Sequence, residues 1–264
     1  MVFRFLIESA RKSKEKVIIY TLSTDIDKYA DFTAINIQKH PDRVEYDVLK
    51  RDEGTVLSHV TVPIPGLFTV YNSLTAFIAA YIEGIDTDSI CRGLADVFVP
   101  GKAEIVPTGR DFSVLIDYAH NPDSIANIID TVKEYAKRTV ILFGCGGDRD
   151  RTKRAVMGEI AARLADHVII TSDNSRGEDP MQIICQIVSG IPPQKAYTVI
   201  PDRASAIRYA IENAKAGDLI LLAGKGHEEY EIDQNGKHEY SERKIVLDHV
   251  TRGRMDFRKK NNID

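Results

Sequence analysis

Short apolar segments alternate with amphipathic segments through the second half of the 264-residue sequence. The apolar segments are rich in β-branched residues, which favour strands, and the amphipathic segments repeat their apolar residues at helical spacing. We expect strands at 113–117, 139–143, 167–171, 197–200 and 218–222, with helices at 123–136, 153–164, 180–188 and 202–214. This alternation is typical of a Rossmann-like α/β fold, an open, mostly parallel sheet with helices on both faces.

Three polar loops follow the predicted strands that end at Phe143, Thr171 and Leu222. The loops cover residues 144–151, 172–179 and 224–228 and contain glycines, arginines and carboxylates. If the three strands are neighbours in one parallel sheet, the loops meet at its carboxyl edge, where open α/β sheets bind ligands. Because arginine pairs with carboxylates and a carboxylate pairs with ammonium, this edge suits a small zwitterion that carries carboxylate groups.

The first hundred residues follow a different pattern. Strand-like segments at 17–22, 32–37, 43–49 and 56–63 are separated by turn residues, and helical spacing follows at 70–83 and 86–97. Val99-Pro100-Gly101 then interrupts the chain, so we expect a partial, mixed α/β domain at residues 1–99 and the Rossmann-like domain at residues 100–264. A hairpin at 229–240, a helix at 241–250 and a polar, frayed tail would complete the second domain.

Composition excludes several classes of function. The net charge of -4 and the pI of about 6.0 do not favour nucleic acid as a partner, and no apolar run is long enough to span a membrane. The start, residues 1–16, has apolar residues before basic ones, the reverse of a secretory signal, so we expect a cytoplasmic protein. The three cysteines form no CxxC pair, which indicates neither a zinc site nor a disulfide framework.

Each loop also has a simpler interpretation. Gly144-x-Gly146 resembles a dinucleotide-binding fingerprint, but Arg149 stands where the third glycine belongs, and a tight strand-to-helix turn explains the glycines equally well. Asp173 and Asn174 are common turn residues, and Gly224-Lys225-Gly226 fits an ordinary turn. The sequence contains no Gly-x-x-x-x-Gly-Lys-Ser/Thr motif, so it lacks a standard triphosphate-binding loop.

Taken together, the motifs resemble those of the Mur ligases. Within that family they are most similar to the members that add the third amino acid, meso-diaminopimelate or lysine, to UDP-N-acetylmuramoyl-L-alanyl-D-glutamate. The resemblance covers residues 20–250. The matching stretches, in chain order, are 66–74, 99–104, 117–122, 143–154, 171–180 and 223–228.

The resemblance implies an ATP-dependent ligase of peptidoglycan precursor synthesis that uses Mg²⁺ and forms an amide through an acyl phosphate. Family members have a UDP-binding domain, a central ATP-binding domain with a P-loop and a carbamylated lysine, and a C-terminal domain that binds the incoming amino acid. Residues 1–99 resemble the last part of the central domain, without its P-loop, and residues 100–264 resemble the whole C-terminal domain. The resemblance therefore implies an N-terminally truncated ligase polypeptide.

The resemblance also assigns roles to individual residues. Asn72 and His120 would contact adenine, Asp117 would hold the ribose, and Lys102, which replaces the family's usual arginine, would lie near ribose and phosphate. Arg176 favours diaminopimelate over lysine because it pairs with the far carboxylate, although Ser175 replaces the family's usual proline. The residues that match the family's diaminopimelate site are Arg149, Asp173, Asn174, Arg176, Gly224 and Glu228.

The sequence leaves more than one interpretation of function. In the first, the chain is a ligase polypeptide whose complete form adds meso-diaminopimelate to UDP-N-acetylmuramoyl dipeptide. In the second, it is a catalytically inactive binding module of the same family. A relative of folylpolyglutamate synthetase is a weaker possibility, and the Asp-Asn-x-Arg loop at residues 173–176 argues against it.

Overall fold

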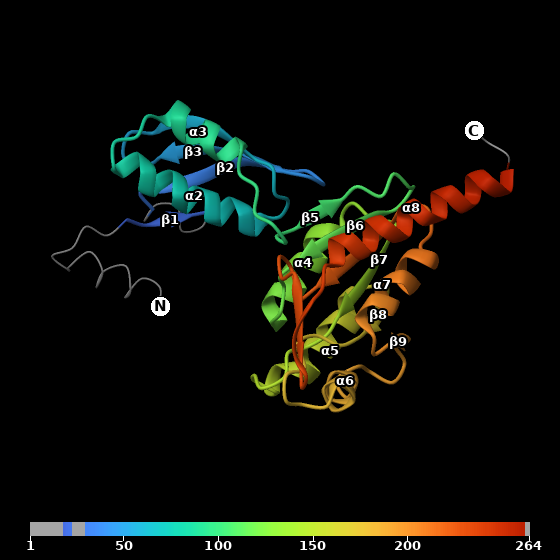
Figure 1. The fold of residues 1–264 in the computed structure, drawn as a ribbon. Helices are drawn as coiled ribbons and strands as arrows, with labels where there is room; N and C mark the ends of the chain where they lie inside the picture. Colours follow the sequence, from blue (N-terminus) through green and yellow to red (C-terminus); the bar gives the residue numbers. More distant parts are fainter. Residues whose placement is uncertain (1–17, 23–29, 262–264) are drawn as a thin grey trace. The chain divides into compact units, whose positions relative to one another are not determined.

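The computed structural model describes residues 18–22 and 30–261. The expected features of residues 1–16, and the first residue of the strand expected at 17–22, lie outside this range. The chain divides into two compact units, Met1–Phe98 and Val99–Asp264 (Figure 1). No helix in the described part of the chain combines the length and the apolar character needed to cross a membrane.

The first unit is a four-stranded sheet covered by two helices. Its strands lie in the order β1-β2-β3-β4, with β1 parallel to β2 and the other pairs antiparallel. Tyr46 and Phe77 are fully buried between the sheet and the helices, and the Tyr46 hydroxyl lies 2.8 Å from Ser73 Oγ. The elements are β1 (Tyr20–Thr21), β2 (Phe32–Lys39), β3 (Val44–Lys50), β4 (Thr55–Val62), α2 (Leu67–Ile82) and α3 (Thr87–Ala95).

The second unit contains the predicted α/β sheet. Its six strands lie in the order β5-β6-β10-β7-β8-β9, and all neighbours are parallel except β5 and β6. This arrangement confirms the Rossmann-like fold class. The strands are β5 (Glu104–Val106), β6 (Ser113–Asp117), β7 (Arg138–Phe143), β8 (His167–Ile170), β9 (Tyr197–Val199) and β10 (Asp218–Ala223). The helices are α4 (Pro122–Lys133), α5 (Thr152–Leu164), α6 (Pro180–Val188), α7 (Arg203–Glu212) and α8 (Glu242–Asn261), and a hairpin joins β11 (Tyr230–Asp233) to β12 (Gly236–Glu239).

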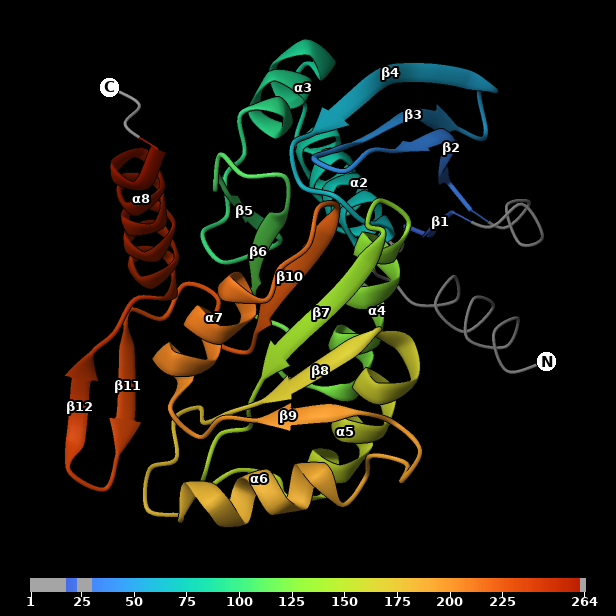
Figure 2. The same cartoon turned by 90° about the vertical axis from the view of Figure 1, so that its right-hand side faces the viewer.

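Helices cover both faces of this sheet (Figure 2). One face packs against α7 and α8, where Leu142 and Leu222 of the sheet join Ile207 and Val246 of the helices in one buried cluster. The other face packs against α4, α5 and α6. Because successive side chains of a strand point to opposite faces, strands buried on both faces are mostly apolar: all six residues of β10 are buried, and every one after Asp218 is apolar.

Two elements differ from the expectations. Strand β5 was not expected, because its three residues lie between Gly101 and Pro107, which are typical of turns. It pairs antiparallel with β6 at the edge of the sheet. Helix α8 continues to Asn261, so the expectation of a frayed tail from Arg252 onward was wrong within the described residues. The residues at the end of this helix are mostly polar, so they show no apolar periodicity from which a helix could be predicted.

Candidate functional site

The three polar loops begin side by side at the carboxyl edge of the second unit's sheet. Strand β7 pairs with β10 on one side and β8 on the other, so Phe143, Ile170 and Ala223 lie on adjacent strands. The Gly147 amide donates to the Asn174 carbonyl at 2.9 Å, which joins the loop after β7 to the loop after β8. The sequence therefore predicted correctly that these loops converge.

Glycine allows these two loops to approach closely. A Cβ atom added at Gly147 would lie 1.9 Å from the Ser175 carbonyl oxygen, which is far inside van der Waals contact. Any other residue at position 147 would therefore push the two loops apart. A Cβ atom at Gly144, the first glycine of the dinucleotide-like motif, would likewise lie 2.5 Å from the Thr171 carbonyl oxygen. Both glycines thus have a structural reason that does not depend on a dinucleotide.

Glu178 ties the same two loops together through its charge. Its carboxylate accepts two hydrogen bonds from the buried Arg154 guanidinium, each at 3.0 Å, and a third from the Asp148 amide at 2.7 Å. Arg151 makes a further ion pair with it at 3.2 Å. The Arg154 hydrogen bonds and the Asp148 amide lower the pKa of Glu178 to about 2, so it is ionised in any neutral solution.

Lys225 is a buried cation in the loop after β10. Its side chain is fully inaccessible to solvent. The ammonium group donates to Asn174 Oδ1 and to the Tyr230 carbonyl, both at 3.0 Å, and lies 3.9 Å from Asp173 Oδ1. Burial lowers the pKa of Lys225, and the neighbouring Asp173 carboxylate opposes that shift.

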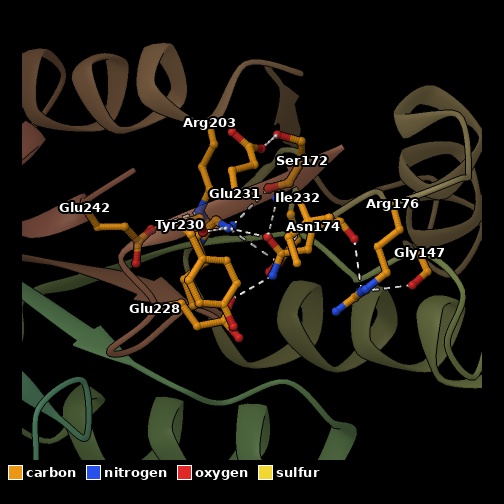
Figure 3. Close-up of polar contacts among 12 residues, drawn as sticks. Gly147, Ser172, Asn174, Arg176, Arg203, Glu228, Tyr230, Glu231, Ile232 and Glu242 are labelled. Carbon is orange, nitrogen blue, oxygen red and sulfur yellow. Dashed lines mark hydrogen bonds and ion pairs between the residues drawn. The ribbon is translucent and has the colours of Figure 1, made fainter. Parts of the chain in front are cut away.

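Asn174 lies between Arg176 and Glu228 (Figure 3). Its Oδ1 atom accepts hydrogen bonds from Lys225 and from the Ile232 amide, and its Nδ2 atom donates to Glu228 Oε2 at 2.7 Å. Its backbone carbonyl accepts from Arg176 Nη1 at 3.2 Å. Asn174 thus connects the cationic and anionic parts of the site.

The two predicted arginines differ in how they are held. Arg176 Nη1 also donates to the Gly147 carbonyl at 2.9 Å, and the residue adopts a φ of 51°, which non-glycine residues adopt only rarely. Arg149 is exposed, and its Nη1 donates to the Asp148 carbonyl at 3.2 Å. Within the described residues, Nε and Nη2 of both guanidinium groups make no hydrogen bond, so both retain donors for a ligand carboxylate.

A buried ion pair between Arg203 and Glu242 holds two of the loops of the site. Arg203, the first residue of α7, donates to the carbonyls of Ser172 and Ala223 at 3.1 and 2.8 Å, and to Glu242 Oε1 at 2.9 Å. These carbonyls belong to the loop after β8 and to the end of β10. Arg203 therefore fixes two of the loops to α8, which begins at Glu242.

The residues predicted for nucleotide binding are divided between the two units. Asn72 is exposed on α2 of the first unit. In the second unit His120 is exposed and its Nδ1–H donates to the Tyr118 carbonyl at 2.8 Å, while Lys102 is half-buried. Asp117 is 1% exposed, and both its oxygens accept backbone amides, those of Ala103 and Ala119, at 2.8 Å. Burial raises the pKa of Asp117.

Sequence reasoning missed the charged residues that hold the site together: the buried Lys225, Arg203 and Arg154, and the half-buried Glu178. Lys225 stands between two glycines, which suggested only a turn, and Arg203 stands in the first turn of a helix, where charged residues are common. Burial of a charge depends on the tertiary fold, so the only sequence signal was the position of these residues in or next to the three loops. Within residues 18–22 and 30–261, no group of three or more His, Cys, Asp or Glu side chains is arranged to hold a metal ion.

Comparison with known proteins matches the second unit of the chain to an established domain. Residues 101–226 match the model of the Mur ligase glutamate ligase domain. The chain is 46% identical over 243 residues to the UDP-N-acetylmuramoyl-L-alanyl-D-glutamate–2,6-diaminopimelate ligase of Caldanaerobacter subterraneus subsp. tengcongensis, covering 91% of this chain and 48% of that one. The chain belongs to the Mur ligase family. The ligase of the same name from Clostridium perfringens is 43% identical over 226 residues, 84% of this chain and 46% of that one.

Solved structures agree with this membership of the Mur ligase family. A UDP-N-acetylmuramoyl-L-alanyl-D-glutamate–2,6-diaminopimelate ligase structure superposes with a TM-score of 0.61 at 30% identity, covering 95% of this chain and 51% of that one. Folylpolyglutamate synthase from Mycobacterium tuberculosis superposes with a TM-score of 0.63, but its 16% identity shows a common fold alone; the comparison covers 96% of this chain and 52% of that one. The chain spans about half the length of the curated relatives that it matches.

Proposed function

We propose that this chain contains the amino-acid-binding part of an ATP-dependent ligase that adds meso-diaminopimelate to UDP-N-acetylmuramoyl-L-alanyl-D-glutamate. The observation that carries the proposal is the convergence of Arg176, Asn174 and Glu228 at one sheet edge, with donors for a carboxylate near an acceptor for an ammonium. The names of the relatives at 43–46% identity support the same reaction. We further propose that the protein acts in the cytoplasm, where the nucleotide-linked precursor would be its partner.

Each residue of the amino acid site has a role that its chemistry suits. Arg149 and Arg176 bind carboxylates through their unpaired guanidinium donors, and Glu228 binds an ammonium group. Asp173 and Asn174 hold the loop in shape. Gly224 has a φ of 114°, and a Cβ atom at this position would lie 2.8 Å from Asp173 Oδ2, so only glycine leaves that carboxylate in place.

The nucleotide-binding residues carry a separate proposal. His120 offers an exposed ring to adenine, and Lys102 offers a cation to the ribose or phosphate. Asp117 binds ribose only if one of its oxygens is shared with a backbone amide, so we assign it chiefly to shaping the turn that presents His120. Asn72, which is exposed on α2, is also proposed to contact adenine.

In the proposed reaction, ATP would convert the D-glutamate side-chain carboxylate to an acyl phosphate, and an amine of diaminopimelate would displace phosphate to form the amide. The 264 residues contain no Walker A sequence, and the described residues offer no cluster of ligands for Mg²⁺, so they do not fit a complete ATP–Mg²⁺ site. This chain's own residues bind the amino acid and orient its amine. Such positioning is a large part of catalysis in amide and phosphoryl transfer.

Calorimetric titration of the 264-residue chain with meso-diaminopimelate and with L-lysine tests this proposal. We expect diaminopimelate to bind more tightly, because lysine lacks the second carboxylate. Arg176→Ala removes a charge-assisted hydrogen bond worth about 1.5–3 kcal/mol, so the preference shrinks roughly tenfold to a hundredfold.

Arg208→Ala is the matched control, since Arg208 is exposed on α7 and its contacts are with Asp202 and Ser205. This variant should keep the preference of the unchanged chain. Equal affinity of the unchanged chain for the two amino acids would contradict the proposed substrate. A preference that survives Arg176→Ala would contradict the role of Arg176 alone.

A further inference from the structure

Lys225 occupies an unusual position for a lysine in a polar loop. Its neighbours Gly224 and Gly226 have positive φ angles of 114° and 54°, and the lysine side chain lies in the interior, with none of it exposed. Buried lysines are rare unless they are paired, because removing an ammonium group from water costs several kcal/mol. The fold therefore retains this charge for the contacts that it makes.

Those contacts determine which way the Asn174 side chain faces. Lys225 and the Ile232 amide are both donors, and both point at Asn174 Oδ1 at 3.0 Å. Turning the amide over would place its NH₂ group against two donors. The NH₂ group is therefore fixed on the opposite side, where it meets Glu228 Oε2 at 2.7 Å.

Glu228 is held by this amide but keeps acceptor capacity. The side chain is half-buried, and its other oxygen lies 3.5 Å from the Tyr118 hydroxyl, at the limit of a hydrogen bond. A carboxylate has about four acceptor positions, so Glu228 retains positions for a ligand ammonium. The direction in which they point depends on Asn174, and hence on Lys225.

Lys225 is not placed to bind the ligand itself. Its ammonium group has no exposed surface and is occupied by Asn174, the Tyr230 carbonyl and the Asp173 carboxylate. A ligand carboxylate would have to displace these buried partners, whereas Arg149 and Arg176 offer unpaired donors. Any effect of Lys225 on binding must therefore act through its neighbours.

We propose that Lys225 is a positioning residue that, through Asn174, aims the Glu228 carboxylate at an ammonium group of the incoming amino acid. This inference rests on the proposed function, since it assumes that Glu228 receives an ammonium. It assigns to Lys225 a part in recognising the amine of the ligand and none in recognising its carboxylates.

Two ligands that differ only in their amines separate these parts. Diaminopimelate carries two ammonium groups and two carboxylates, and pimelate has the same seven-carbon chain with the carboxylates alone. Lys225→Met keeps the length of the side chain and removes its charge. We expect this variant to bind diaminopimelate about tenfold more weakly and pimelate within about twofold of the unchanged chain. The exposed Lys244, on α8, provides the control Lys244→Met, which should alter neither affinity.

A double-mutant cycle tests whether Lys225 acts through Glu228. Glu228→Gln alone should weaken diaminopimelate binding, and adding Lys225→Met should then cause little further loss. Additive losses, or an equal loss for pimelate and diaminopimelate, would overturn the positioning role while leaving the proposed function intact. Failure of the unchanged chain to prefer diaminopimelate over pimelate would overturn both.

Asn174→Asp and a spectroscopic measurement cover the case in which Lys225→Met does not fold. The aspartate keeps an acceptor for Lys225 and removes the donor to Glu228, so it should produce the same selective loss of diaminopimelate binding. In ¹⁵N-labelled chain, the Asn174 side-chain NH₂ signal should shift on Glu228→Gln without any ligand. An unchanged signal, or Asn174→Asp with full diaminopimelate affinity, would contradict the proposed link.

Discussion

Individual charged residues hold the site loops at fixed distances from one another. Glu178 is the clearest case. Its carboxylate forms ion pairs with Arg154 and Arg151 and accepts a hydrogen bond from a backbone amide of the neighbouring loop. Arg154 in turn donates to the Gly146 carbonyl at 3.0 Å. The separation between Arg149 and Arg176 therefore depends on a residue that need not touch a ligand.

The charge of Glu178 gives stability a defined dependence on pH. The pKa of its carboxyl is lowered from 4.5 to about 2 in the folded chain. A lowered pKa stabilises the fold above the unfolded value, and this contribution is lost as pH falls from about 4.5 to about 2. We expect Glu178→Gln to lower Tm at neutral pH and to differ less from the unchanged chain near the acid end of this window.

Melting curves recorded by circular dichroism across that pH range would check this expectation. Glu159→Gln, a change of an exposed glutamate on α5, should leave Tm nearly unchanged at every pH. If the Tm difference caused by Glu178→Gln stays constant down to the lowest pH, the charge of Glu178 does not stabilise the fold.

At the scale of elements, α7 links the sheet to the loops of the site. The residue before the helix, Asp202, caps its N-terminus: its side chain accepts from the Ser205 amide at 2.8 Å, and this cap places Arg203 beside the ends of β8 and β10. Strand β10 lies between β6 and β7, so its loop lies next to the turn that follows Asp117 and next to the loop after β7. The sheet order thus brings the two proposed binding regions of the second unit together.

Removing Arg203 should destabilise the second unit strongly. Arg203→Met leaves Glu242 as an unpaired buried charge, and breaking a buried pair in this way costs about 3–5 kcal/mol. The double variant Arg203→Met, Glu242→Met removes both charges and should recover much of that loss. Urea denaturation provides the free energies of unfolding, and a single variant as stable as the unchanged chain would contradict the structural role of the pair.

At the scale of the whole molecule, the sequence predicted most of the fold but only part of the site. The bounds of β6 and α6 were predicted without error, because apolar runs and a proline at a helix start are local signals. The place of β10 between β6 and β7 was not predictable, since spatial order is not written in local periodicity. Arg176, Asn174 and Glu228 were proposed from their loops, whereas the burial of Lys225 and Arg203 required the tertiary structure.

The chain by itself should not complete the ligase reaction. Its 264 residues lack a Walker A sequence, so nothing in them matches a standard triphosphate cradle. We expect no ADP release above background from the purified chain supplied with ATP, Mg²⁺, UDP-N-acetylmuramoyl dipeptide and meso-diaminopimelate. Sustained ADP release that requires diaminopimelate would show that this chain holds a triphosphate site of another kind.

The central claim is that the three loops of the second unit form a site for diaminopimelate. A crystal structure of the 264-residue chain with meso-diaminopimelate would test it most directly. The account predicts one ligand carboxylate within hydrogen-bond distance of Arg176 and an ammonium group within hydrogen-bond distance of Glu228, with Lys225 still bonded to Asn174. A ligand bound elsewhere on the chain, or bound at the loops with its carboxylate away from Arg176, would contradict it.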